Sequence, residues 1–416
     1  MGMTIAEKIL ATHAGKESVS PKEIVDAELD YVMVNDVTGL PAFEVFEEFG
    51  AAPIREKAVL IQDHYVPNKD VASAEQAKSM RDFAKKYRIV NHFDVGRGGV
   101  CHQIMIEEGF AAPGRLIVGA DSHTCSYGAL GALSTGIGSS EAASAMATGE
   151  LWFRVPETQK FIVDGEPGNY VMGKDIILHI IGDIGVSGSL YRSMEFYGSA
   201  IVSLSLSDRI TISNMAIEAG AKCGIIPPDE KVSTYLKDRV IGDYSPVYAD
   251  VGAEYEDTFE YDAAEIVPMV AKPHLPENVV PASEIDVTID QAYLGSCTNG
   301  RIEDLRCAAE ILEGKKVHPD VRMIVVPASK SVFEDALREG LIETFMAADA
   351  YVAGPTCGAC LGGYMGVLAA GERCVSSTNR NFIGRMGHKD SEVYLANPAV
   401  VAASAITGRI TDPNDL

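Results

Sequence analysis

The sequence predicts an α/β fold divided into three domains, on three observations. Its 416 residues exceed what one hydrophobic core usually organises, and 47% of them are hydrophobic, which is ample material for several cores. Short apolar runs bounded by glycine recur along the chain, each followed by a polar loop and often by a helical pattern, as in buried parallel strands. Proline-rich breaks then separate the chain into unequal parts.

The clearest break is the polar run KPHLPENVVPASE at 272–284, which holds three prolines. A weaker break lies near Val155-Pro156. We therefore predict α/β domains at 1–155, 156–272 and 285–416, with 273–284 as a linker.

Each of the apolar runs that predict a strand is followed by a loop of polar residues that could take part in a functional site. Because ligands bind beyond the carboxyl ends of strands in open α/β sheets, we expect these loops to meet at one site. A helical pattern over 303–312 follows one loop, with Asn299 as its expected N-cap. The loops are Gln62-Asp63-His64, Asp121-Ser122-His123, Ser296-Cys297-Thr298-Asn299, the stretch after 350–353, and Thr378-Asn379-Arg380-Asn381.

Composition excludes several classes of function. The net charge of −24 disfavours binding to nucleic acid or to an anionic membrane, because both depend on clustered Lys and Arg. The sequence has no uninterrupted run of 18 apolar residues, so it predicts no membrane-spanning helix. Acidic and polar residues interrupt the apolar residues at the start of the chain, which disfavours a secretory signal peptide. We expect a cytoplasmic protein whose eight cysteines are free, metal-bound or catalytic rather than paired in disulfides.

The stretch GPTCGACLGG places Cys357 and Cys360 in a Cys-x-x-Cys pair among glycines. A thioredoxin-like redox pair would begin a helix, which Gly362-Gly363 disfavours. A closed zinc site requires four ligands, and the sequence has no second pair of this kind. On spacing alone, two buried thiols beside a tight turn are the default interpretation.

Cys297 changes this balance because it follows another expected strand of the same domain. Three thiolates from two strand-end loops could hold an iron–sulfur cluster and leave one iron without a protein ligand. Cys307 and Cys374 could supply a fourth ligand, but they lie within an apolar helical pattern and a strand-like run, so both are expected in the core.

Six stretches resemble motifs of the aconitase superfamily, in the same order, and the match runs from residue 4 to 413. The resemblance implies three α/β domains packed around a central [4Fe-4S] cluster, one per chain, held by Cys297, Cys357 and Cys360 with one iron free of protein ligands. It also implies a hydro-lyase that isomerises a 2-hydroxy di- or tricarboxylate by dehydration and rehydration. The stretches are GVCHQ, VGADSHT, SNMAIEAGA, GSCTNGRIEDL, GPTCGACLGG and STNRNFIGRMG.

The resemblance also implies roles for individual residues. His64 is the expected acid that protonates the departing hydroxyl, and the arginine forks suit substrate carboxylates. For the arginines and the helix bearing Asn214 and Glu218, a solvated surface is the alternative. The implied acid–histidine pairs are Asp63 with His64, Asp121 with His102, and Glu218 with His123. The implied substrate-binding residues are Gln62, Ser122, Asn214, Asn379, Arg380 and Arg385.

Fused members of the superfamily carry a further, swivelling domain, for which this chain has no remaining length. We therefore expect a separate small subunit and a hetero-oligomeric enzyme. Two alternatives remain open on the sequence. One is a zinc-dependent hydrolase built on His64, His102 and His123, which leaves the motif cysteines unexplained. The other is an iron-regulated RNA-binding protein, which the acidity of the chain disfavours.

Overall fold

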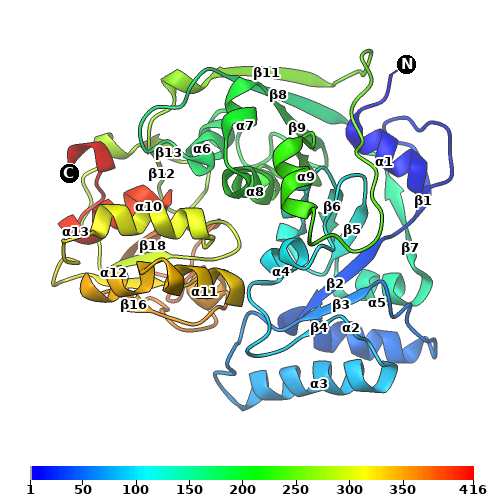
Figure 1. Ribbon diagram of the computed structural model, residues 1–416, viewed down its shortest axis with the longest axis horizontal. Helices are drawn as coiled ribbons and strands as arrows, with labels where there is room; N and C mark the ends of the chain where they lie inside the picture. The colour runs from blue at the N-terminus through cyan, green and yellow to red at the C-terminus, as the bar shows by residue number, and fades with distance from the viewer. Residues whose placement is uncertain (1) are drawn as a thin grey trace.

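Strands gather into four sheets over residues 2–416, the part of the chain that the computed structural model describes. Three of them are the α/β sheets of five, four and seven strands, and the fourth is a two-stranded antiparallel ribbon. The chain begins and ends at opposite sides of the molecule (Figure 1). The fold class is therefore the mixed α/β class that the apolar runs predicted.

The first sheet has the strand order β4-β3-β2-β5-β6, and every neighbouring pair is parallel. Its residues alternate between two cores. Val32 and Leu60 pack with α2, α3 and α5, whereas Val59 and Ile117 pack with α4 and η1. The elements are α1 (Ile5–His13), β2 (Tyr31–Asn35), α2 (Asp36–Glu48), β3 (Ala58–Ile61), α3 (Val71–Tyr87), β4 (His92–Phe93), α4 (Cys101–Glu107), β5 (Leu116–Gly119), η1 (Ser122–Leu130), β6 (Leu133–Gly136) and α5 (Ser139–Thr148).

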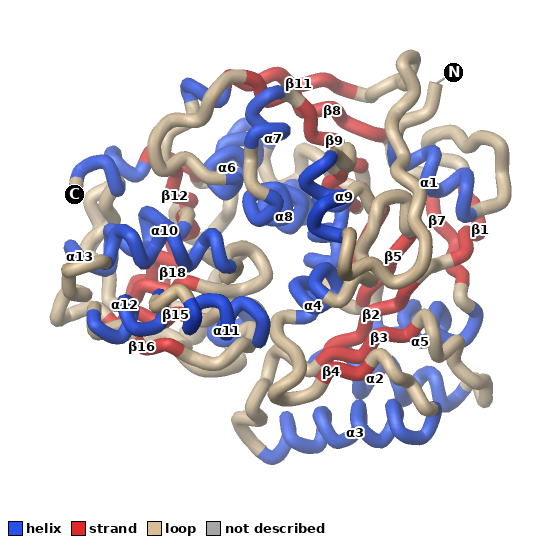
Figure 2. Tube along the Cα trace, in the orientation of Figure 1, coloured by secondary structure: helices blue, strands red, loops and turns tan. Residues whose placement is uncertain are grey.

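The antiparallel ribbon pairs β1 (Ile24–Glu28) with β7 (Glu150–Arg154). It closes the outer edge of the first part of the chain beside α1 (Figures 1 and 2).

The second sheet has the order β10-β9-β8-β11 and is also parallel throughout. Ile176, Ile180 and Phe196 form part of its core, and none of them is exposed. The elements are β8 (Thr158–Asp164), α6 (Gly173–Ile184), β9 (Ser193–Tyr197), α7 (Ser199–Ser203), α8 (Leu206–Met215), η2 (Ala216–Ala219), β10 (Cys223–Ile225), α9 (Glu230–Leu236), β11 (Asp257–Asp262) and η3 (Ala263–Glu265).

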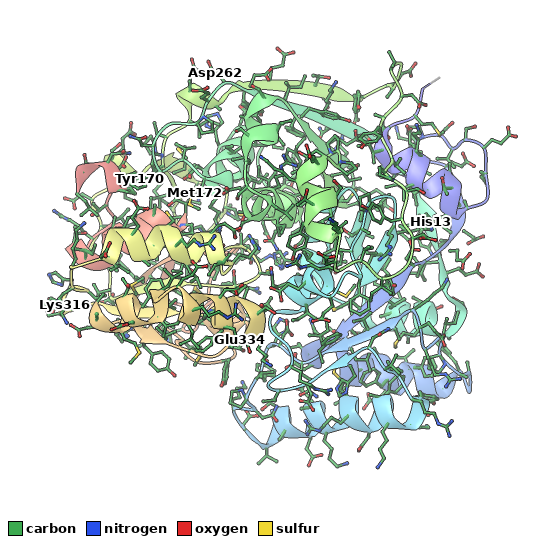
Figure 3. All side chains as sticks on the ribbon, viewed as in Figure 1. His13, Tyr170, Met172, Asp262, Lys316 and Glu334 are labelled. Atoms are coloured by element: carbon green, nitrogen blue, oxygen red, sulfur yellow. The ribbon has the colours of Figure 1, made fainter. Side chains whose placement is uncertain are left out.

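The third sheet has the order β13-β12-β18-β17-β14-β15-β16, parallel from β18 to β16 and antiparallel at β12 and β13. Charged side chains such as Lys316 and Glu334 project outward from this part (Figure 3). The elements are β12 (Met269–Ala271), β13 (Val279–Pro281), η4 (Ala282–Glu284), β14 (Gln291–Leu294), α10 (Ile302–Leu312), β15 (Arg322–Val325), α11 (Lys330–Arg338), α12 (Leu341–Ala347), β16 (Tyr351–Val352), η5 (Gly358–Leu361), β17 (Arg373–Ser376), β18 (Glu392–Ala396), α13 (Pro398–Thr407) and η6 (Pro413–Asp415).

Two local expectations differ from the structure. The segment 273–284, expected as a linker, contains β13, which pairs with β12 and so belongs to the third sheet. The helix expected over 303–312 is present as α10, but its N-cap is Arg301 rather than Asn299. The Asp304 carboxylate accepts a hydrogen bond from the Arg301 backbone N–H. This contact places the N-cap two residues later in the chain than Asn299. The three domain boundaries remain a prediction.

None of the helices within residues 2–416 has both the length and the apolar character needed to cross a membrane.

Candidate active site

A cavity of about 280 Å³ lies where the loops of the first and third sheets meet. The side chains that line it follow β2, β3, β5, β14, β16 and β17, so it occupies the carboxyl ends of parallel strands, as expected. The lining residues are Asn35, Val37, Thr38, Asp63, His64, Val100, Cys101, His102, Asp121, Ser122, His123, Cys297, Cys357, Cys360, Leu361, Asn379, Arg380 and Arg385.

Cys297, Cys357 and Cys360 all line this cavity and are at most 6% exposed. The Cys297 sulfur accepts hydrogen bonds from the amide nitrogens of Asn214 and Asn379, at 3.2 and 3.3 Å. Such donors favour a thiolate, the form that binds metal, although burial and the neighbouring Cys360 and Asp121 raise the pKa of Cys297 to about 12 overall. Asn214 lies outside the cavity wall and acts on the site through this sulfur.

Cys357 and Cys360 shift the pKa values of one another in opposite directions. A hydrogen bond from Cys357 lowers the pKa of Cys360 against the effect of burial, and the Arg385 guanidinium favours the same thiolate. The Nε atom of Arg385 is buried and has no hydrogen-bond partner within residues 2–416. Three sulfurs in one cavity, one of them favoured as thiolate by Cys357 and by the Arg385 guanidinium, fit an iron–sulfur cluster held by three cysteines.

A fourth cysteine lines the cavity, and it is neither of those considered from the sequence. Cys307 packs against the core of the third sheet and Cys374 is fully buried within β17. Cys101 reaches the cavity instead, but burial and the nearby Asp63 and Asp121 raise its pKa well above the usual value.

His64 lies between two carboxylates. Its Nδ1 atom is 2.6 Å from Oδ1 of Asp63 and 3.4 Å from Oδ1 of Asp36. Burial opposes protonation of the ring, but attraction to both carboxylates outweighs it and raises the pKa of His64 well above its usual value. The imidazole is therefore protonated near neutral pH and can donate a proton.

Asp36 was not predicted from the sequence, although it organises this corner of the site. Its carboxylate accepts hydrogen bonds from the backbone N–H groups of Asp63, His64 and Tyr65, at 3.4, 3.1 and 2.9 Å. Burial raises the pKa of Asp36, but hydrogen bonding and attraction to His64 outweigh this and lower it overall. Asp36 is thus the ionised partner that keeps His64 positive.

Asp121 connects all three histidines. Its Oδ1 atom lies 2.9 Å from Nε2 of His102 and 3.6 Å from Nδ1 of His123, while Oδ2 lies 4.0 Å from Nε2 of His64. Burial opposes ionisation, but His102 and His123 lower the pKa of Asp121 well below its usual value. The other nitrogen of His102, Nδ1, lies 3.0 Å from the hydroxyl of Tyr127.

Glu218 closes the far side of the site. It lies 2.9 Å from Nε2 of His123 and 2.8 Å from Nε of Arg380. Burial raises the pKa of Glu218, but its hydrogen bond with His123 and its attraction to Arg380 lower it overall. All three acid–histidine pairs expected from the resemblance are therefore in contact, and the Asn214–Glu218 helix is buried rather than solvated.

Zinc would find few free nitrogens here. Both nitrogens of His102 are engaged, and Asp36, Asp63 and His64 lie within 4.8 Å of one another but are joined by their own hydrogen bonds. Among the described residues, Asp36, Asp63 and His64 are thus the one group close enough together to hold a metal ion, and the zinc alternative leaves the three cysteines of the cavity unexplained.

Two of the expected substrate-binding residues, Gln62 and Asn214, do not line the cavity. Gln62 does not line the cavity, because its side chain turns toward α3 and donates to the Ala77 carbonyl at 3.2 Å. Asn35 takes a place in the wall instead, and donates to Asp121 at 3.2 Å. Asn35 ends the apolar run of β2, so the strand-end pattern that identified the other loops could have found it.

A buried cation lies behind the cavity. Lys174, on α6, is fully buried and its ammonium donates to the backbone carbonyls of Ser377 and Thr378. These residues precede Asn379 and Arg380, so Lys174 fixes the loop that carries both. Burial lowers the pKa of Lys174 to about 7, even though nearby Asp175 and Asp304 favour its charged form.

Sequence comparison defines the class to which this fold and site belong. A model of the aconitase family (aconitate hydratase) matches residues 7–287 and 281–408, so the chain is a member of the aconitase family. The solved holo-form of aconitase X from Thermococcus kodakaraensis resembles it with a TM-score of 0.50 and 12% identity, over 85% of this chain and 84% of the other, which shows a shared fold.

Individual relatives are much more similar. The chain is 58% identical to the "3-isopropylmalate dehydratase large subunit 1" of Pyrococcus abyssi, over the whole of both chains. It is 57% identical to the "3-isopropylmalate dehydratase large subunit" of Aquifex aeolicus, covering 100% of this chain and 98% of the other. A third protein with the latter name, from Halothermothrix orenii, is 55% identical over the whole of both chains.

Proposed function

We propose that this chain is the large, catalytic subunit of a [4Fe-4S]-dependent 3-isopropylmalate dehydratase, which interconverts 2- and 3-isopropylmalate in leucine biosynthesis. Full-length identity of 55–58% to proteins of that name supports the substrate. The observation that carries the chemistry is the meeting of three cysteine sulfurs with a protonated histidine and an arginine pair in one cavity.

The cysteines supply the ligands and the histidines the proton chemistry. When bound, a [4Fe-4S] cluster with one iron free of protein ligands supplies a Lewis acid for a hydroxyl and a carboxylate. His64, held positive by Asp36 and Asp63, delivers a proton to the departing hydroxyl, which leaves as water. Asp121 orients His102 and His123 toward the same space.

Substrate carboxylates need local positive charge, because the net charge of −24 repels anions. Arg380 and Arg385 face the cavity and present planar forks that match carboxylates. Asn379, Ser122 and Asn35 offer further polar contacts in the same wall.

The second half of the reaction depends on a partner. The carbon-bound proton must pass to a base, which the family resemblance assigns to the swivelling domain on a separate small subunit. The proposed enzyme is therefore a hetero-oligomer. Because part of the substrate-reading surface then lies on the partner, homoaconitase and the dehydratases of 2,3-dimethylmalate or methylmalate are the alternative activities.

The first experiment measures iron, acid-labile sulfide and zinc per chain, on protein purified without oxygen. About four irons with matching sulfide, falling to roughly three after exposure to air, is the expected result. Stoichiometric zinc without sulfide would instead support a zinc hydrolase. Cluster-loaded chain is then assayed with candidate small subunits on 2-isopropylmalate, and robust turnover by the chain alone would contradict the two-subunit proposal.

A further inference from the structure

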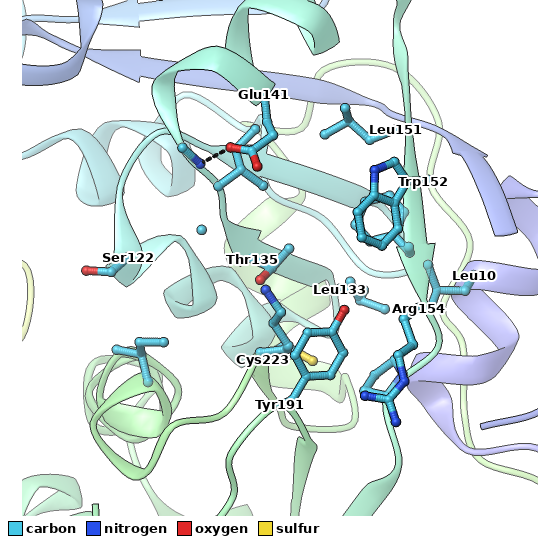
Figure 4. A pocket seen from close by; sticks show the side chains of 17 residues that line it. Leu10, Ser122, Leu133, Thr135, Glu141, Leu151, Trp152, Arg154, Tyr191 and Cys223 are labelled. Carbon is cyan, nitrogen blue, oxygen red and sulfur yellow. Dashed lines mark hydrogen bonds between the residues drawn. The ribbon is translucent and has the colours of Figure 1, made fainter. Parts of the chain in front are cut away.

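A second cavity, of about 470 Å³, lies on the other side of the Asp121–His123 loop from the candidate active site. It is enclosed by β6, β7 and the segments around Tyr191 and Lys222, so it lies between the first sheet, with its antiparallel ribbon, and the second sheet (Figure 4). Most of its wall is apolar, with Leu10 and Leu133 buried at its base. This size and lining are typical of sites for small organic ligands.

One end of this cavity is positive. Arg154 and Lys222 both lie over the ring of Tyr191, at 5.2 and 4.9 Å from its centroid. Lys222 forms no ion pair within residues 2–416, and the carboxylate of Glu157 lies 4.0 Å from Arg154. In a chain with a net charge of −24, cations left this free attract an anion.

The backbone of Tyr191 holds this end in place. Its φ angle is +64°, a left-handed conformation that is uncommon for a residue with a side chain. The Tyr191 N–H donates to the Gly220 carbonyl at 3.0 Å, which stabilises the turn. Unusual backbone angles are enriched at ligand sites.

The other end is apolar apart from one carboxylate. Trp152, the only tryptophan of the chain, borders the cavity and is 63% exposed. Glu141 lies at the far end from Arg154 in Figure 4, and its carboxylate accepts a hydrogen bond from the Gly138 N–H at 2.7 Å. A ligand with one anionic group and an apolar body would satisfy the cations and cover the indole.

Two walls of this cavity are continuous with the active site. Ser122 lines both cavities and lies between Asp121 and His123. On another wall, Ile217 directly precedes Glu218. The contact is also tight, because a Cβ atom at Gly136 would lie 2.7 Å from the Asp121 carbonyl oxygen. Displacement of these walls would therefore move residues that hold His102 and His123.

We propose that this cavity is a regulatory site for a small organic acid with a single carboxylate and an aliphatic or aromatic body. The carboxylate binds at the end of the cavity that carries Lys222 and Arg154, and the apolar body lies against Leu133 and Trp152. Binding adjusts the active site through Ser122 and Ile217. This inference is independent of the proposed reaction, because its tests measure binding and backbone protection without turnover.

The test uses 4-phenylbutyrate as the anionic probe and 4-phenylbutylamine as its cationic match, with the full chain. The fluorescence of Trp152 reports binding directly because the chain has no other tryptophan. Calorimetry on the complex with the small subunit provides a measurement that does not depend on fluorescence. We expect a saturable change with the acid and none with the amine. Equal responses to both compounds, or no saturable binding of the acid, would overturn the proposal.

Two matched variants test the cationic end. Lys222→Gln is expected to weaken binding of the acid about tenfold, the effect of losing one charge-assisted hydrogen bond. Lys160→Gln is the control, because Lys160 lies over the ring of Tyr197 at 4.8 Å in the same kind of contact but outside the cavity. Unchanged affinity in Lys222→Gln would contradict the site.

Amide hydrogen exchange tests the link to the active site. The acid should slow exchange in peptides that cover 121–124 and 216–219, and Lys222→Gln should need about tenfold more acid for the same protection. Binding without any change in these two peptides would refute the regulatory role.

Discussion

Replacing Asp36 by Asn should shift the alkaline limit of activity to lower pH. Asp36 lies 3.4 Å from Nδ1 of His64 and, with Asp63, raises the pKa of that ring well above about 6.5. His64 serves as an acid only while protonated, so activity is lost as the pH rises through its pKa. Without the Asp36 charge, this loss should begin earlier.

The size of the shift follows from the geometry. A unit charge at 3.4 Å, in an effective dielectric of about 20, interacts with the imidazolium by about 5 kcal/mol. Asn retains an oxygen that accepts some of the backbone hydrogen bonds, and the Asp63 carboxylate remains 2.6 Å away. We therefore expect a decrease of about 1–2 pH units in the alkaline limit, equivalent to about 1.4–2.7 kcal/mol.

Stability should respond with the same sign. The pKa of His64 is higher in the folded than in the unfolded protein, so protonation of His64 adds to the free energy of unfolding. This contribution is complete below the unfolded-state pKa of about 6.5 and is lost as the pH rises through the folded-state pKa. Asp36→Asn should remove part of this pH dependence, because the Asp63 carboxylate remains 2.6 Å from the ring.

The assay is the pH profile of kcat/KM for cluster-loaded large subunit combined with small subunit. Asp30→Asn is the matched control, because Asp30 lies 3.5 Å from His13 in an acid–histidine pair far from the cavity (His13 is labelled in Figure 3). An unchanged alkaline limit in Asp36→Asn, or an equal shift in both variants, would refute the reasoning.

Three further predictions separate site residues from neighbours. Asn35→Ala should raise KM about tenfold and also lower the melting temperature, because the Asn35 side chain caps α2 by accepting hydrogen bonds from the Val37 and Thr38 N–H groups. Gln62→Leu should lower the melting temperature through a lost buried hydrogen bond of about 1 kcal/mol and leave KM unchanged; a raised KM in Gln62→Leu would restore Gln62 to the site. Cys297→Ser should lose iron and sulfide, as measured by elemental analysis. Cys374→Ser should retain both, because Cys374 is fully buried in β17 and does not reach the cavity. Loss of iron and sulfide in both variants would mean a general folding defect. Arg380→Gln should lower kcat/KM by roughly 10–100-fold, because it removes a carboxylate contact and leaves Glu218 without its cationic partner, and a kinetic constant within twofold of the parent would argue against the clamp.

The strand-end pattern located most of the site from sequence because it depends on topology rather than on contacts. Asp63, Asp121 and Cys297 all follow short apolar runs, and the parallel sheets bring them together. Asp36 could not be found in this way. It is the first residue of α2, where a carboxylate is usually a helix-start residue, and its role depends on the 63–65 backbone lying across the helix end.

Gln62 shows a second limit of the sequence. It adjoins Asp63 and His64, but successive residues at the end of a strand point to opposite sides. The Gln62 side chain lies toward α3, whereas those of Asp63 and His64 lie toward the cavity. The sequence alone does not show which of these neighbouring side chains faces the site. The regulatory cavity was equally hidden, because its walls come from two sheets whose contact is not encoded in any local pattern.

The position of the cysteines along the chain has a consequence for biosynthesis. The proposed ligands are residues 297, 357 and 360 of 416, so the first two sheets are synthesised before any ligand exists. The loop that holds Cys357 is fastened to the first sheet by hydrogen bonds from the Cys357 N–H and the Thr356 hydroxyl to the Asp63 carbonyl, at 2.9 and 2.8 Å. A cluster held by these three residues could therefore be delivered only after residue 360 has been synthesised, when the segments of the first two sheets are already complete.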